Sequence, residues 1–170
     1  MIRAWTLAEL ARRYLGAYGP ATRDDFALWW RGTSRAQSQR LIESLEVTPV
    51  DLEGTRAYLL AGAVRPAAEA RSVRLLPAFD PYVVGAPRSG GLFPAAHKAR
   101  IFRPQGWISP VLLVDGHVEG VWRHERRNGR LEVLIEPFAR QPPRVRAGAA
   151  EEAERLAVFL GARLDKLAWR

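Results

Sequence analysis

Residues 34–60, SRAQSQRLIESLEVTPVDLEGTRAYLL, contain a helical pattern that is followed at once by two strand-like runs. Serine is a common N-terminal cap of helices, so a helix is expected to begin after Ser34. The residues of this helix that are expected to face the core recur at helical spacing, on one face. These positions are Ser38, Leu41, Ile42 and Leu45. Glu53-Gly54 separates the runs Val47–Leu52 and Thr55–Leu60, as in a short hairpin. The stretch therefore predicts a helix that leads into a β-hairpin.

Two further helices are expected before this stretch. Thr6-Leu7-Ala8-Glu9 has the form of a capping box, and Gly19-Pro20 ends the helix that follows it. Thr22-Arg23-Asp24-Asp25 begins the second helix, for which Gly32 is the expected C-terminal cap. Three helices and a hairpin, in this order, are typical of a winged helix-turn-helix, whose third helix enters the major groove of DNA. We therefore predict a winged helix-turn-helix domain over residues 1–62.

Gln37 and Gln39 have the residue type of a catalytic pair, but their spacing argues against that role. Side chains two residues apart on a helix lie roughly 200° apart around its axis, so they do not converge on one reacting atom. Gln39 and Arg40 point away from the apolar face, and both residue types bind base edges or phosphates. Acidic residues near this helix end and hairpin leave a solvated helix face as the alternative to DNA contact. They are Glu43, Glu46, Asp51 and Glu53.

The rest of the chain has the pattern of a β-rich domain. Residues 63–70 are small and loose and are interpreted as a linker, and residues 71–170 form the second domain. Strands are predicted at Ser72–Leu76, Ile101–Arg103, Val111–Asp115, Val118–His124 and Leu131–Glu136, with hairpin turns at Gly116-His117 and Asn128-Gly129. A helix over Pro142–Leu160 and a strand over Ala162–Trp169 follow. The predicted fold class is α+β: a winged helix-turn-helix, then a small antiparallel β-barrel or curled sheet with a C-terminal helix and strand.

The positive charge of the chain is concentrated in its middle part. The formal net charge is +8, and residues 61–146 hold fourteen basic and seven acidic side chains. One basic cluster contains Lys98, Arg100 and Arg103, and another contains Arg123, Arg126, Arg127 and Arg130 around the Asn-Gly turn. A narrow, positive hairpin tip suits insertion against DNA phosphates or into a minor groove, whereas a solubilising turn is the alternative. Trp107 and Trp122 either stack on bases or, as for most tryptophans, pack in the core.

Few signs of catalysis or of a metal site are present. The chain has no cysteine, and His97, His117 and His124 lack the spacing of metal ligands, so neither a metal nor a cofactor is predicted. Asp80 before Pro81 is a weak catalytic candidate, and a turn cap is the favoured interpretation. No apolar run of about 18 residues predicts a membrane span, and we expect a cytoplasmic protein with no membrane partner.

Several segments resemble a known family. They are YLGAYGPATRDDFALWW, RLLPAFDPYVVG, RIFRPQGWISPVLLVDGHVEGVWR and RLEVLIEPF, which in this order resemble the bacterial winged helix DNA-binding domain family. That family includes the YcaQ/AlkZ-type DNA glycosylases, which release alkylated bases and unhook interstrand crosslinks. The resemblance covers residues 6–169 and implies tandem winged helices followed by a β-barrel, with a hairpin that probes the DNA minor groove.

The resemblance also implies that this chain matches only the C-terminal part of the family. The active glutamines of the glycosylases belong to a Gln-x-Gln motif in their N-terminal part, and Gln37-Ser38-Gln39 lies in a different element. We therefore expect a protein that binds double-stranded DNA without base excision of its own, because it has lost that activity or because it is a fragment. The alternatives are a minimal glycosylase that uses Asp80 or Glu125, and a module that completes a partner protein carrying the N-terminal half.

Overall fold

The computed structural model describes residues 6–52, 54–63, 71–85 and 91–170. Contacts divide the chain into two units, the first formed by Met1–Ala67 with Gly85–Gly90 and the second by Ala68–Val84 with Gly91–Arg170. The predicted linker occupies residues 63–70, of which 64–70 lie outside the described residues, as does Glu53 of the first hairpin. No helix in the described ranges is long and apolar enough to cross a membrane.

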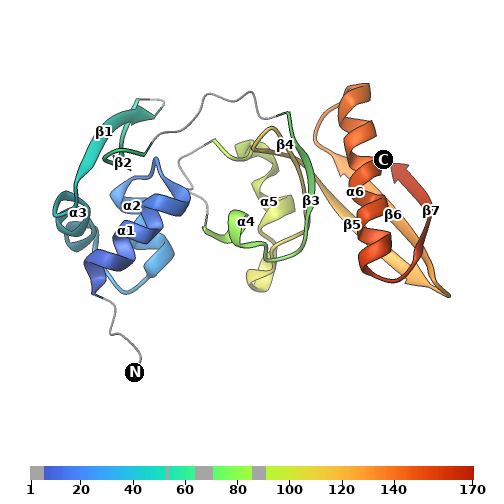
Figure 1. Ribbon diagram of the computed structural model, residues 1–170, viewed down its shortest axis with the longest axis horizontal. Coiled ribbons are helices and arrows are strands. Elements are labelled where there is room, and N and C mark those ends of the chain that lie inside the picture. The colour runs from blue at the N-terminus through green and yellow to red at the C-terminus, as the bar shows by residue number, and fades with distance from the viewer. Residues whose placement is uncertain (1–5, 53, 64–70, 86–90) are drawn as a thin grey trace. The chain divides into compact units, whose positions relative to one another are not determined.

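The first unit contains the three predicted helices: α1 (Leu7–Tyr18), α2 (Arg23–Trp30) and α3 (Arg35–Glu43) (Figure 1). Each helix begins after a hydroxyl side chain that accepts a backbone N–H of the first turn, which satisfies a donor without an intrahelical partner. These caps are Thr6, Thr22 and Ser34. Only Thr22 forms a full capping box, because the buried Asp25 side chain accepts the Thr22 backbone N–H in return.

The hairpin of the first unit has the predicted limits. β1 (Val47–Leu52) pairs antiparallel with β2 (Thr55–Leu60) over all six residues. Ser38 and Ile42, on the predicted inner face of α3, are fully buried. The core that holds the helices to the hairpin is formed by Ala11, Tyr14, Leu15, Ala21, Phe26, Ile42 and Tyr58.

Tyr14 contributes its ring to this core but leaves its hydroxyl without a partner. The Tyr14 ring lies 5.0–5.3 Å from the rings of Tyr18, Phe26 and Trp29, and burial raises the pKa of the Tyr14 phenol. Among the described residues no hydrogen-bonding group reaches Tyr14 Oη. The unsatisfied hydroxyl therefore costs free energy of folding.

We expect Tyr14→Phe to stabilise the protein by about 1 kcal/mol, because the substitution keeps the ring and removes the unsatisfied hydroxyl. The midpoint of thermal unfolding should rise by about 4–8 °C if the first unit unfolds independently. Differential scanning calorimetry of the two proteins measures this shift. Tyr18→Phe is the matched control, since it removes a hydroxyl of a less buried tyrosine in the same aromatic cluster. A loss of stability in Tyr14→Phe would show that the hydroxyl is satisfied.

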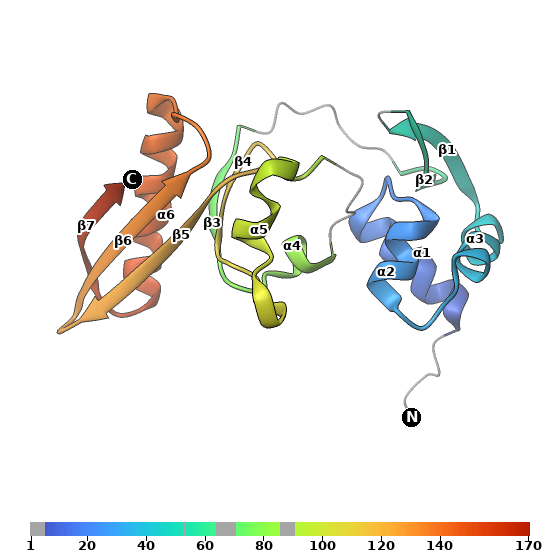
Figure 2. The same ribbon diagram turned by 180° about the vertical axis from the view of Figure 1, so that it is seen from behind.

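The second unit is built on a five-stranded sheet in the order β3-β4-β5-β6-β7. The strands are β3 (Val73–Leu76), β4 (Val111–Val114), β5 (His117–Arg127), β6 (Arg130–Pro137) and β7 (Arg163–Trp169). Helix α6 (Pro143–Phe159) packs on one face of this sheet, and Figure 2 shows β5 and β6 in front of it. Its small residues Ala149, Ala153 and Ala157 are buried there and permit a close approach to the strands.

Short helical segments separate β3 from β4. They are α4 (Pro81–Gly85), η1 (Ala95–His97), α5 (Lys98–Ile101) and η2 (Pro104–Gly106). The predicted strand Ile101–Arg103 is therefore wrong: Ile101 ends α5 with its side chain fully buried, and only Phe102 forms an isolated bridge, to Ile108. A run of three residues is too short for its periodicity to distinguish a strand from a helical turn.

Of the two forms predicted for this sheet, an antiparallel β-barrel and a curled sheet, the barrel is wrong. In the described part of the chain, β3 pairs only with β4 and β7 pairs only with β6, so the two edges of the sheet do not meet. β7 runs parallel to β6, whereas the other neighbouring strands are antiparallel. Parallel neighbours need a long crossover connection, and α6 supplies it. The mixed α+β class and the C-terminal helix and strand are confirmed.

The two hairpin turns of the second unit both use consecutive left-handed residues. Asn128 and Gly129 have φ values of 49° and 73°, and Asp115 and Gly116 have φ values of 50° and 85°. Two positive φ angles identify the tight turn that matches the twist of the strands. The Asn-Gly turn is confirmed, while the other turn lies one residue earlier than predicted. The Asp115 carboxylate also pairs with the Arg144 guanidinium of α6, which lowers the pKa of Asp115.

Candidate nucleic-acid interface

The tip of the β5–β6 hairpin carries arginines on both of its faces. Arg126 lies opposite Leu131 in the register, on the side of the sheet that packs on α6. Arg127 lies opposite Arg130, and successive residues of a strand point to opposite faces, so this pair occupies the other side. All residues from Arg123 to Arg130 are exposed. The hairpin is therefore a narrow ribbon with guanidinium groups directed to either side.

Carboxylates near the hairpin tip pair with two of these arginines. The Arg127 guanidinium lies 3.1 Å from the Glu125 carboxylate, and the Arg130 guanidinium lies 4.0 Å from that of Asp165. Exposed ion pairs contribute little free energy, because water and salt screen them. Among the described residues, the contact of the Arg126 guanidinium is a long one, 3.5 Å, to the Gly161 carbonyl oxygen. The tip arginines are thus held weakly enough for a phosphate to replace their present partners.

The structure brings residues of the two predicted basic clusters together in one pocket. Arg100 and Arg103 line a pocket of about 570 Å³ with Arg123 of the hairpin strand, whereas Lys98 is exposed on α5 outside it. Arg100 is committed to internal contacts: its guanidinium lies 3.3 Å from the Glu136 carboxylate and 5.0 Å from the centre of the Phe138 ring. In the sequence Arg100 and Arg103 are about twenty residues from Arg123, and it is the fold that brings the three residues to one pocket.

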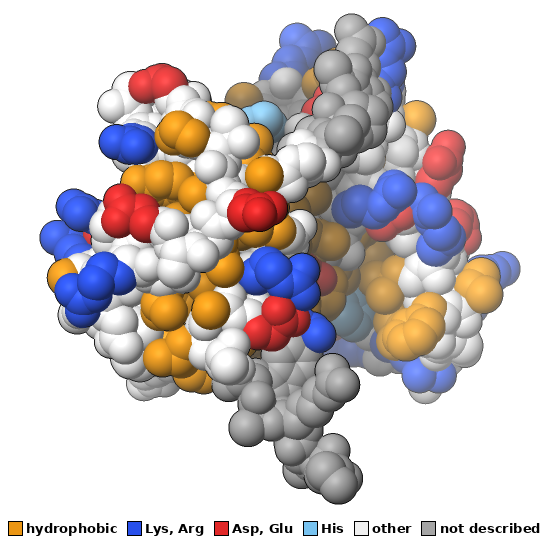
Figure 3. Space-filling model, turned by 60° about the vertical axis from the view of Figure 1, so that its left-hand side comes forward, with side chains coloured by type: hydrophobic (Ala, Val, Ile, Leu, Met, Phe, Trp, Pro, Cys, Tyr) orange, Lys and Arg blue, Asp and Glu red, His pale blue; other side chains and the backbone are white. Residues whose placement is uncertain are grey.

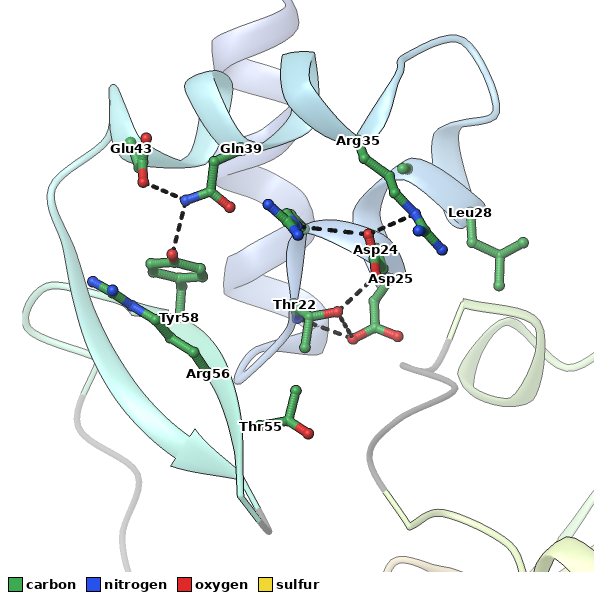
Figure 4. A pocket seen from close by; sticks show the side chains of 12 residues that line it. Thr22, Asp24, Asp25, Leu28, Arg35, Gln39, Glu43, Thr55, Arg56 and Tyr58 are labelled. Atoms are coloured by element: carbon green, nitrogen blue, oxygen red, sulfur yellow. Dashed lines mark hydrogen bonds and ion pairs between the residues drawn. The ribbon is translucent and has the colours of Figure 1, made fainter.

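Of the two residues predicted to face DNA on α3, Gln39 is half-buried and is already hydrogen bonded. Its amide nitrogen donates to the Tyr58 hydroxyl, at 2.9 Å, and to the Glu43 carboxylate (Figure 4). This contact ties α3 to β2, and it is made at the mouth of an open pocket that also holds the Asp24–Arg35 ion pair. Arg40 is exposed. On the face of the first unit that Figure 3 draws, positive and negative side chains are interspersed.

Asp80 has the geometry of a turn cap. Its Oδ1 accepts the Tyr82 backbone N–H at 2.8 Å, and its backbone carbonyl accepts N–H groups from Val83 and Val84. Glu125, the other acidic candidate, pairs with Arg127 at the hairpin. In the described ranges no three His, Cys, Asp or Glu side chains gather as metal ligands would.

Comparisons with known proteins place this arrangement in a family. The family model described as DNA glycosylase AlkZ-like matches residues 2–159. The chain belongs to the AlkZ-like DNA glycosylase family. It is 35% identical over 135 residues to the interstrand DNA cross-link repair glycosylase of Streptomyces sahachiroi, an alignment that covers 75% of this chain and 35% of that protein.

A solved structure of the AlkZ-like family has the same fold over nearly the whole chain. The structure of Streptomyces sahachiroi DNA glycosylase AlkZ matches with a TM-score of 0.71 and 30% identity, over 96% of this chain and 44% of that one. The chain therefore spans less than half the length of the relatives that it matches.

The two tryptophans of this AlkZ-like chain that were candidates for base stacking lie in different environments. For each of them the sequence left two alternatives, stacking on a base or packing in the core. Trp122 is buried in the sheet core and donates its Nε1–H to the Leu76 carbonyl at 2.8 Å. Trp107 is 52% exposed and lines the pocket with Arg103 and Arg123. The position of Trp122 in an alternating strand indicates burial, whereas Trp107 follows the turn residues Gln105 and Gly106, outside any periodic element.

Proposed function

We propose that this chain is a DNA-binding part of an AlkZ-like repair system and that it grips double-stranded DNA with the β5–β6 hairpin. The observation that carries the proposal is the exposed ribbon tip, with Arg126 on one face and Arg127 and Arg130 on the other. A two-stranded ribbon with cations on both faces can reach the phosphates on the two sides of a groove. Membership of a DNA glycosylase family supports DNA as the polyanion.

Other basic residues extend the proposed surface. Arg100 and Arg103 add positive charge beside Arg123, the first arginine of the ribbon, and Lys98 is an exposed cation on α5, the helix that also carries Arg100. Arg100 is expected to contribute less to phosphate binding than the others, because its guanidinium already contacts the Glu136 carboxylate and the Phe138 ring.

The first unit is proposed to be a winged helix-turn-helix that makes a secondary contact. The order of α1, α2, α3 and the β1–β2 hairpin supports this interpretation, with α3 as the helix directed to the major groove. Arg40 would contact phosphate, and the carbonyl oxygen of Gln39, which Figure 4 shows on the side away from Glu43, would accept from a base edge. The mixed charges of this unit make its contact weaker than that of the hairpin.

Titration of duplex DNA at two or more salt concentrations tests the proposal. Each phosphate neutralised by a cation contributes about −0.9 to the slope of log affinity against log salt, so three hairpin arginines alone give about −2.7. Flat salt dependence, or no binding at low salt, would contradict the proposed function. Incubation with alkylated and with cross-linked duplexes, followed by a search for abasic sites, shows whether the chain also excises bases.

A further inference from the structure

The pocket between η2 and β5 presents an aromatic face to solvent. Trp107 is 52% exposed, and its ring meets the ring of Phe79 edge to face with centroids 5.0 Å apart. Phe79 is itself 47% exposed. The backbone before Trp107 is left-handed at Gln105, with φ of 61°, and Phe79 has φ of 58°. Non-glycine residues adopt this conformation rarely, and such strain gathers at functional sites because it positions a group that binding requires.

Cations without an internal partner lie beside this aromatic face. Arg103 and Arg123 line the same pocket as Trp107, and among the described residues no carboxylate pairs with either of them. The neighbouring polar groups are already occupied: Ser109 Oγ donates to the Arg100 carbonyl, and the Arg100 guanidinium contacts Glu136. His124 also lines the pocket, and its ring stacks on that of Trp122. The pocket therefore offers a ligand the exposed Trp107 ring and two guanidinium groups, with the His124 imidazole beside them.

We propose that this pocket binds one unpaired nucleotide of DNA, with the base stacked on Trp107 and its phosphate held by Arg103 and Arg123. The inference rests on the proposed function and adds a substrate class to it. Stacking on an indole requires a free π-face, which a base in an intact duplex presents to its neighbours and not to a protein. Arginine suits the phosphate because its planar fork of donors matches two phosphate oxygens. The pocket volume, about 570 Å³, lies in the range of small-molecule sites.

The location of the pocket connects it with the hairpin. Arg123 belongs to β5, the same strand that carries Arg126 and Arg127 to the tip. A hairpin that holds duplex phosphates therefore brings any locally unpaired nucleotide near the pocket. The predicted preference is for duplexes with an open or mismatched tract over fully paired duplexes.

The test compares two duplexes of equal length and charge, one fully paired and one with three central mismatched pairs. Wild-type protein is expected to bind the mismatched duplex about 5- to 150-fold more tightly, the contribution of one stacked base. Trp107→Ala should abolish this preference and leave affinity for the paired duplex unchanged, whereas Trp107→Phe should retain most of it. Arg123→Gln should reduce the preference through the phosphate. Phe159→Ala is the matched control, since Phe159 is an aromatic residue 85% exposed outside the pocket.

The outcomes separate this inference from the proposed function. If the wild type binds both duplexes equally, or if Trp107→Ala folds and keeps the full preference, the pocket does not bind an unpaired nucleotide in the way proposed. If neither duplex is bound at low salt, the proposed function fails as well. Because Trp107 is half exposed, its replacement should leave the fold intact, and circular dichroism of the variants verifies this. Should Trp107→Ala unfold, Trp107→Phe and Arg123→Gln decide the question.

Discussion

Replacing Arg126, Arg127 and Arg130 together by glutamine is expected to lower the affinity for duplex DNA about a hundred- to a thousandfold at low salt. The estimate takes roughly 1–1.5 kcal/mol for each charge-assisted contact with a phosphate. The slope of log affinity against log salt should become less steep by about 2.7, because three counterions fewer are released. Fluorescence anisotropy of a labelled duplex at several salt concentrations measures both quantities.

The control for the hairpin variant removes the same charge elsewhere. Arg140, Arg146 and Arg155 are exposed residues before or on α6, and their joint replacement by glutamine also lowers the net charge by three. This control should change the affinity several-fold at most, since it alters only the overall field of the protein. An equal loss of DNA affinity in the two variants would mean that the affinity depends on the net charge of the protein and not on contacts of the hairpin with DNA.

Trp122→Ala is expected to destabilise the second unit by about 3–5 kcal/mol, since it deletes a large buried ring and leaves a cavity. Trp122 is 5% exposed, packs in the same cluster as Ile135 and Ala149, and donates its Nε1–H to the Leu76 carbonyl. The indole thus joins the central strand β5 to β3 at the edge of the sheet. Because the free energy of unfolding of a whole domain is only about 5–15 kcal/mol, the substitution would remove much of the stability of the second unit. Unfolding in urea measures the change.

Trp107→Ala is the natural comparison for that experiment, since it removes the same side chain from an exposed position. We expect its free energy of unfolding to differ from that of the wild type by less than about 1 kcal/mol. A similar loss in both variants would mean that Trp107 is also part of the core.

The parts of the fold that depend on neighbouring residues were predictable from the sequence. The inner face of α3 follows from the spacing of Ser38 and Ile42, and the long hairpin follows from Asn128-Gly129 between two strand-like runs. In both cases a few consecutive residues determine the backbone: helical periodicity for α3 and two left-handed angles for the turn.

The parts that depend on distant contacts were not predictable in the same way. Nothing local indicates that β7 runs parallel to β6, since both directions satisfy the pattern of Arg163–Trp169. The candidate site shows the same limit: Arg103 and Arg123 belong to separate clusters in the sequence, and only the course of the chain through η2 and β5 places them with Trp107. Even where the residue types were identified, as for Gln39, its hydrogen bond to Tyr58 required the structure.

The parallel pairing of β7 has a consequence for how the protein is made. In the chain β7 follows α6, whereas its partner β6 precedes α6 and is therefore synthesised first. During translation one edge of β6 therefore exposes a row of unsatisfied amide and carbonyl groups until β7 leaves the ribosome. Such a row can pair with other nascent chains. Synthesis should thus be the period in which this protein is most liable to self-association, and the pairing of β7 with β6 should end it.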